Sequence, residues 1–150
     1  MIALLQRVRE ASVTIEGTVE GQIEQGLLIL LGIEHRDELS DVDWLVKKIT
    51  AMRIFSDEEG KMNLSCEDVS GNYLVISQFT LHASVKKGNR PSYIDAARPD
   101  QAIPLYNSFL DALKVKTRKD IQSGKFGADM KVSLINDGPV TIIIDSRDRK

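Results

Sequence analysis

The chain has 150 residues, of which 42% are hydrophobic and 28% charged, with 20 basic and 22 acidic residues and a net charge of −2. This length and balance predict a single soluble domain over residues 1–150, and the longest apolar stretch, residues 26–33, is too short to span a membrane. A polyanionic partner would need a local basic patch, since the overall field is not positive. Cys66 is the only cysteine, which excludes an intrachain disulfide and indicates a cytoplasmic protein.

The N-terminal third is predicted to form a meander of short β-strands. Residues 1–7 are interpreted as the first strand, and they lack the pattern of a signal peptide. Residues 12–16 alternate polar and apolar side chains before the turn residue Gly17, and residues 27–31 form a run of the buried type. These strands need a cover, which the next segment can provide.

A helix and a strand are predicted in the middle of the chain. Apolar side chains recur there at helical spacing: Val42, Leu45, Val46, Ile49 and Met52. Ser40 is a good N-cap with Asp43 three residues on, so an amphipathic helix from Asp41 to about Arg53 should pack across the sheet. Residues 73–79 are the best strand candidate, and a loop of unusual composition, residues 86–91, follows.

The last third is predicted to hold a second helix and two strands. The helix should begin near Asp100, with Pro104 in its first turn and a cluster of cations at its end that suits the helix dipole. Residues 131–135 and 140–144 are interpreted as strands joined by a turn at residues 136–138. Together these elements indicate a mixed α and β fold.

Generic catalytic motifs are absent from the sequence. It contains no Walker loop, no G-x-G-x-x-G, no H-E-x-x-H and no G-x-S-x-G. His35 and His82, the only histidines, have no cysteine partners or clustered carboxylates, so both are interpreted as solvated or packed and no metal or cofactor is expected. The acidic residues 57–59 fit a turn, and Asp41 and Asp43 fit a helix start, better than a glycosidase pair.

Two short sequences carry a resemblance to a known family. Residues 77–81 read Ser-Gln-Phe-Thr-Leu and residues 138–141 read Gly-Pro-Val-Thr, which are the two signatures of the D-aminoacyl-tRNA deacylase family in the family's order. Further matches extend over essentially the whole chain: residues 7–13, 88–92, 124–130 and 136–139. His82 stands where the family commonly has tyrosine and Tyr93 where it frequently has phenylalanine, and both keep a flat ring.

The resemblance implies a fold and an activity. The fold is a compact domain of largely antiparallel sheets in a barrel-like arrangement, covered by two main helices. The activity is translation quality control: hydrolysis of the ester joining a D-amino acid, or glycine, to tRNA. L-aminoacyl-tRNA would be rejected by a Gly-cisPro step, Gly138–Pro139, because a corner without a Cβ can approach the substrate's α-carbon closely. Arg7 is expected to support this corner by hydrogen bonds to backbone carbonyls, the alternative being a solvated strand residue.

The other wall of the site is implied to come from the first signature, namely Ser77, Gln78, Phe79 and Thr80. It would supply backbone donors and a hydroxyl near the scissile carbonyl. Thr80 as a nucleophile stays open, but no base is nearby in sequence, so we favour a mechanism in which the terminal ribose 2′-hydroxyl assists a water. Phe126 and Met130 border the terminal adenosine in this interpretation, with core packing as the equal alternative.

The implied partners are tRNA and a second copy of the chain, with no membrane and no DNA. Lys86, Lys87 and Arg90 are the best candidates for a tRNA surface, and the tail cations Arg147, Arg149 and Lys150 are weaker ones. The active site is expected across a symmetric dimer, with the corner of one subunit entering the pocket of the other. A nucleic-acid binder without turnover and an inactive structural dimer are the alternatives, and the presence of both signatures favours the enzyme.

Overall fold

The structure is a computed structural model that describes residues 1–149, and one long strand organises its sheet. Strand β1 (Ile2–Ile15) pairs with β3 (Gly26–Gly32) along its first half and with β2 (Thr18–Ile23) along its second half, while β8 (Lys131–Asp145) pairs with nearly its whole length. These three pairings are antiparallel. Strands β6 (Asn72–Ser77) and β7 (Gln122–Ser123) then extend the sheet from β3 in parallel.

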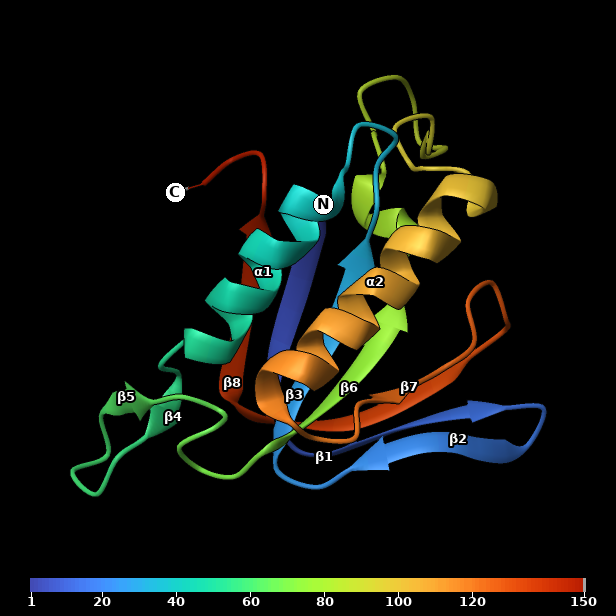
Figure 1. Ribbon diagram of the computed structural model, residues 1–150. Helices are drawn as coiled ribbons and strands as arrows, with labels where there is room; N and C mark the ends of the chain where they lie inside the picture. Colours follow the sequence, from blue (N-terminus) through green and yellow to red (C-terminus); the bar gives the residue numbers. More distant parts are fainter. Residues whose placement is uncertain (150) are drawn as a thin grey trace.

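The two faces of this sheet are buried by different parts of the chain. Helices α1 (Leu39–Ala51) and α2 (Pro99–Thr117) lie side by side across one face, where Leu5, Ile29 and Val75 are fully buried (Figure 1). On the other face the far halves of β1, β2 and β8 curl round and enclose a second cluster, which contains Val8, Ala11, Val13, Ile23, Leu28, Leu74 and Ile76. The predicted mixed fold with a barrel-like sheet and two covering helices is confirmed.

A bulge in β1 makes this curl possible. Val8 and Ala11 both belong to the second cluster although strict alternation would put them on opposite faces. The pairing with β8 shifts between Val8 and Glu10, which leaves Arg9 as an extra residue and reverses the alternation beyond it. The N-terminal region is therefore not a simple meander: β1 is a single strand of 14 residues that lies between β2 and β3 in the sheet.

Both predicted helices exist, with different starts. Helix α1 begins at Leu39 and its N-cap is Glu38, because Glu38 and Asp41 form a reciprocal capping box. The prediction of Ser40 as N-cap with Asp43 as its partner was therefore wrong. Helix α2 begins at Pro99, so Pro104 lies inside the helix and not in its first turn. None of the helices formed by residues 1–149 is long and apolar enough to cross a membrane.

Two strand predictions also need correction. The strand predicted for residues 73–79 ends at Ser77, and Phe79–His82 form a 3-10 helix, η1. The two predicted C-terminal strands are one strand, β8, interrupted by a bulge and not by a turn. Short strands β4 (Phe55–Ser56) and β5 (Met62–Leu64) form a separate hairpin beyond the end of α1.

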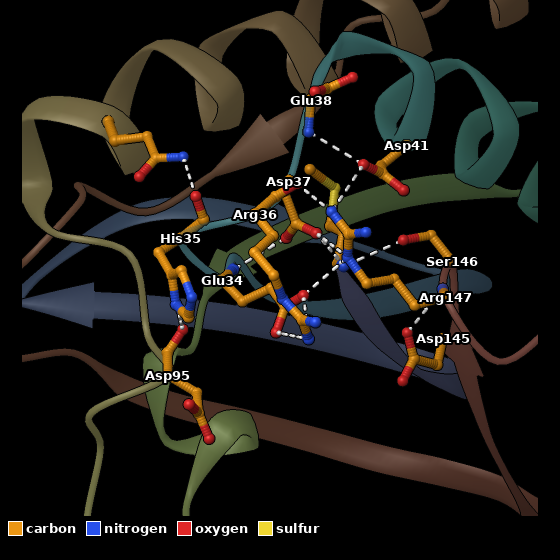
Figure 2. A network of polar contacts seen from close by, with 12 residues as sticks. Glu34, His35, Arg36, Asp37, Glu38, Asp41, Asp95, Asp145, Ser146 and Arg147 are labelled. Carbon is orange, nitrogen blue, oxygen red and sulfur yellow. Dashed lines mark hydrogen bonds and ion pairs between the residues drawn. The ribbon is translucent and has the colours of Figure 1, made fainter.

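A network of charges lies where β1 begins and β8 ends (Figure 2). Arg147 places its Nε 2.7 Å from a Glu34 carboxylate oxygen and 3.5 Å from Asp37, and its Nη2 3.8 Å from Asp41. The Asp37 side chain is fully buried, and it also accepts a hydrogen bond from the backbone N–H of Glu34 and pairs with the ammonium of Met1. The network ties β1, β8 and the start of α1 together.

Two carboxyl groups of this network are shifted toward their charged form. Burial raises the pKa of Glu34, but hydrogen bonding and charge from Arg36 and the charge of Arg147 outweigh it, so its pKa is lowered. For Asp41 the same burial effect is outweighed by hydrogen bonds from Glu38 and Ser146 and by nearby positive charge, so its pKa is also lowered. Both acids therefore stabilise the fold as carboxylates.

Candidate active site

A cleft of about 250 Å³ opens beside the carboxyl end of β6. It brings together five of the predicted site residues: Ser77, Gln78, Phe79, Phe126 and Met130. The remaining lining residues are glycine, alanine and branched aliphatic residues contributed by β3, β6, α2, β8 and the loops beside them. Among the described residues 1–149, none that lines the cleft carries a titratable side chain.

The first signature is held by a sharp change of backbone at the end of β6. The N–H of Gln78 still donates to the carbonyl of Leu31 (2.8 Å), and the chain then turns into η1, where the N–H of Leu81 donates to the carbonyl of Gln78 (3.3 Å). The N–H groups of Phe79 and Thr80 begin this helix and have no acceptor within it. They are the backbone donors available at this turn, and Phe79, 55% exposed, is not a core residue.

Gly32 is a supporting residue that sequence reasoning missed. A Cβ at this position would lie 3.0 Å from the carbonyl oxygen of Gln78 and 3.0 Å from the Cβ of Leu81. A side chain at residue 32 would therefore make tight contacts with the signature turn, and glycine lets the strand β3 approach it closely. The one sequence signal that could have identified this role is the position of Gly32, directly after the buried-type run at residues 27–31.

Thr80 does not line the cleft. Its Oγ1 accepts a hydrogen bond from Nε2 of Gln78 at 2.5 Å. A side-chain amide that donates to the hydroxyl cannot take its proton, so this contact orients Gln78 and does not activate Thr80.

The aromatic side of the cleft is fixed from α2. The ring of Phe126 packs edge-on against Tyr106 with 5.8 Å between centroids, and the Tyr106 hydroxyl donates to the carbonyl of Val75 at 3.0 Å. Burial raises the pKa of Tyr106 to about 12, so this hydroxyl stays protonated at neutral pH. Phe126 is thereby oriented by the core while it borders the cleft.

The second signature forms a projecting corner on β8. Gln6 pairs with Thr141 and Val8 with Asn136, so the four residues 137–140 face the single residue Arg7. The Gly138–Pro139 peptide bond within this bulge is cis, and both residues are exposed.

Asn136 closes the bulge, a role that the sequence analysis did not assign to it, although it placed Asn136 in a turn and in the family match over residues 136–139. Its Nδ2 donates to the carbonyls of Val140 (2.9 Å) and Arg7 (3.0 Å), and its Oδ1 accepts from the N–H of Val140 (3.2 Å). A Cβ at Gly138 would lie 2.7 Å from Cγ2 of Val140. The corner is therefore a tightly closed loop that has no room for a side chain at its first residue.

Arg7 supports the corner through its guanidinium group. Its Nε donates to the carbonyl of Asp137 at 2.8 Å, and its Nη1 donates to the carbonyl of Ile54 at 2.6 Å. The residue is buried, with 8% of its surface exposed. Arg7 is thus not a solvated strand residue, because its guanidinium links the bulge of β8 to the segment between α1 and β4.

The corner and the cleft are not brought together within one chain. Arg7 lies opposite Leu27 on β3, whereas Ser77 lies opposite Leu31. Arg7 and Ser77 are therefore offset by four residues along the direction of β3, a distance of about 13 Å. Neither Gly138 nor Pro139 lines the cleft.

The predicted basic residues divide into two groups. Lys86, Lys87 and Arg90 are exposed on the segment that rises above the carboxyl ends of β3 and β6 (Figure 1). In the tail, Arg147 belongs to the charge network and Arg149 lies 4.8 Å from the centre of the Trp44 ring. Lys150 lies outside the described residues.

Comparisons with known proteins cover the whole chain. A family model described as D-Tyr-tRNA(Tyr) deacylase matches residues 4–145. Proteins named D-aminoacyl-tRNA deacylase from Cytophaga hutchinsonii and Flavobacterium johnsoniae are 59% and 58% identical over 150 residues, with 100% of each chain covered.

Solved structures agree in fold. One described as a c-Myc DNA unwinding element binding protein is 44% identical, with a TM-score of 0.92 over 97% of this chain and 98% of that one. Another, described as a probable eukaryotic D-amino acid tRNA deacylase, is 17% identical, with a TM-score of 0.80 over 95% and 97% of the two chains, and it supports the fold alone.

Proposed function

Because the chain belongs to the D-aminoacyl-tRNA deacylase family, whose members are hydrolases of the aminoacyl-tRNA ester bond, we propose that it removes D-amino acids and glycine from tRNA and spares L-amino acids. The observation that carries this proposal is the closed Gly138–Pro139 corner, which offers bare backbone to a substrate. Charged tRNA is a cytoplasmic substrate, and the protein would act there.

The cleft suits the ester end of the substrate. In this proposal the terminal adenosine lies beside Phe126 and Met130, which both line the cleft, because a base can stack on an aromatic ring whatever its identity. The N–H group of Phe79, a residue that lines the cleft, then polarises the ester carbonyl. With no titratable side chain lining the cleft, the 2′-hydroxyl of the terminal ribose is left to assist the attacking water.

The corner supplies selectivity from a second subunit. A backbone corner placed against the α-carbon leaves space for hydrogen and collides with a side chain, so a D residue or glycine is accepted and an L residue is not. Within one chain the corner lies too far from the cleft, which favours a C2 dimer in which each corner enters the partner's cleft.

An uncovered apolar stripe supports this dimer. Ile143, Leu4 and Leu30 are cross-strand neighbours on β8, β1 and β3 and lie on the face opposite the helices. Ile143 is 67% exposed, and the other two are half-buried. A second copy that packed on this stripe would bury apolar surface on both subunits.

The test uses purified protein and three esters of matched tRNA, namely D-aminoacyl, L-aminoacyl and glycyl. We expect loss of the D and glycyl esters at rates far above spontaneous hydrolysis, measured without protein, and no acceleration for the L ester. Equal hydrolysis of both enantiomers would show that the protein has no chirality filter. If no ester were hydrolysed although the protein still bound tRNA, the protein would be a nucleic-acid binder without turnover.

A further inference from the structure

Two exposed aromatic rings stand at the mouth of the cleft. Phe79 lines the cleft, whereas Tyr93 lies outside it, and their ring centroids are 5.0 Å apart at an interplanar angle of 75°. Phe79 is 55% exposed and Tyr93 39% exposed. The aromatic surface therefore continues outward from the site proposed for the terminal adenosine.

The backbone holds Tyr93 in place from both sides. Its neighbour Ser92 exchanges two backbone hydrogen bonds with Ser84, at 2.8 and 2.9 Å. Beyond it, the N–H of Ala96 donates to the carbonyl of Tyr93 at 3.1 Å, and the N–H of Ala97 donates to the carbonyl of Ile33 at 2.9 Å. An aromatic ring displayed on fixed backbone loses little entropy on binding, which suits a recognition surface.

The charge around this ring pair favours a polyanion. The Ser84–Ser92 bridge closes the loop that carries Lys86, Lys87 and Arg90, and all three are exposed. Aromatic rings beside a group of exposed cations are the combination that binds single-stranded nucleic acid, because bases stack on the rings while the cations contact phosphates.

We propose that Tyr93, together with Phe79, forms a stacking platform for the unpaired nucleotide that precedes the terminal adenosine of the tRNA. This inference rests on the proposed function, since the adenosine must occupy the cleft for its neighbour to reach the platform. In this arrangement the bound adenosine positions the ester in the cleft. The platform positions the nucleotide that precedes the adenosine.

Two substrates separate the platform from the cleft: D-aminoacyl-tRNA, and the same amino acid esterified to adenosine alone. For Tyr93→Ala we expect kcat/KM on the tRNA to fall roughly 5- to 100-fold, mainly through KM, as for the loss of one stacked base. The adenosine ester should be cleaved as by the wild type, and Tyr93→Phe, which keeps the ring, should retain activity on both.

A direct readout uses an acceptor-stem RNA with 2-aminopurine before the terminal adenosine and an amide in place of the ester. Its fluorescence should be quenched on binding to the wild type and to Tyr93→Phe, and not by Tyr93→Ala, since stacking quenches this base. If the wild type cleaves neither ester, the proposed function fails, and quenching still tests the platform.

Three results would overturn the platform. Equal losses on both substrates would mean that Tyr93 only holds Phe79 in the cleft. Unchanged kinetics and quenching would mean that no base stacks there. A weaker dimer in sedimentation, with RNA quenching intact, would make the ring pair a contact between subunits.

Discussion

The charge network around Arg147 (Figure 2) and the cleft beside Ser77 lie near the same end of the sheet, where β3 and β6 finish, and their chemistry is opposite. The network contains three carboxylates within 4 Å of one arginine, and two of these acids have lowered pKa values. The cleft is lined by no titratable side chain. Perturbed acids in this molecule therefore stabilise the fold, while the proposed chemistry depends on backbone, amide and substrate groups. The contrast predicts which changes reduce activity and which reduce stability.

The largest effect should come from the substrate itself. Replacing the terminal ribose 2′-hydroxyl of D-aminoacyl-tRNA by hydrogen should lower the single-turnover rate at least about 100-fold, since the cleft offers no side chain to assist the water. Binding of the deoxy substrate, measured separately, should be nearly unchanged. A deoxy substrate cleaved at the normal rate would mean that the protein supplies the missing group.

The next effect concerns the basic loop. Replacing Lys86, Lys87 and Arg90 together by alanine should weaken tRNA binding about 10-fold at moderate salt and reduce the slope of log K against log salt by about 2 to 3. The preference for the D ester should stay. The matched control replaces Lys47, Lys48 and Lys116, three exposed cations on the helices. The same loss in both variants would show a general charge effect and not a tRNA surface.

A smaller effect is expected at Thr80. Thr80→Ser keeps the hydroxyl that accepts from Gln78, so kcat should stay within about 3-fold of wild type, whereas Thr80→Val should lose about 10-fold because the Gln78 amide loses its partner. Mass spectrometry of the protein quenched during turnover tests the alternative. An acyl group on Thr80 would establish covalent catalysis.

The smallest effect on activity should accompany a clear loss of stability. Arg147→Met removes ion pairs to three acids, and because its side chain is 37% exposed we expect a loss of only about 1–2 kcal/mol in the free energy of unfolding at pH 7. Activity at 25 °C should be unchanged. Lys61→Ala, which breaks the exposed pair with Glu59, is the control and should leave stability unaltered.

The same variant carries a pH dependence. The pKa values of Glu34 and Asp41 are lowered on folding, so their contribution is present above the pKa of the unfolded chain and is lost as pH falls through the folded values. The urea midpoint of the wild type should therefore fall in acid, and that of Arg147→Met should fall less. If the urea midpoints of the two proteins fell in parallel with decreasing pH, the network would not be the source of the acid sensitivity.

Periodicity and motifs predicted much of the fold, and tertiary contacts explain what they missed. The buried run of β3 and the apolar stripes of both helices were recognisable because they depend on local spacing. The start of α1 was misplaced because Glu38 and Asp41 cap it reciprocally, although Ser40 is the better N-cap by type. Local pattern predicted a turn at residues 136–138, whereas these residues belong to a bulge that Asn136 closes through hydrogen bonds to Arg7 and Val140. The support from Arg7, which lies 130 positions away from Asp137, was expected only through the family resemblance.

The site residues followed from the family signatures and not from chemical type. Side-chain chemistry alone would have directed attention to the acids and arginines of the network, because no described residue that lines the cleft has a titratable side chain. Gly32 and Asn136 act only through backbone approach and backbone hydrogen bonds, so their roles became visible in three dimensions.

The central claim is that each active site combines the cleft of one subunit with the corner of another, and subunit mixing tests it most directly. One variant carries Gln78→Ala with Phe79→Ala, and the other carries Gly138→Ala with Pro139→Ala. Each homodimer should be inactive, and circular dichroism and sedimentation check that each folds and dimerises. After unfolding, equal mixing and refolding, about half the dimers should be heterodimers, each with one intact cleft facing one intact corner, so activity should recover to about a quarter of wild type. No recovery, with heterodimers detected by native mass spectrometry, would place cleft and corner in the same subunit and contradict the claim.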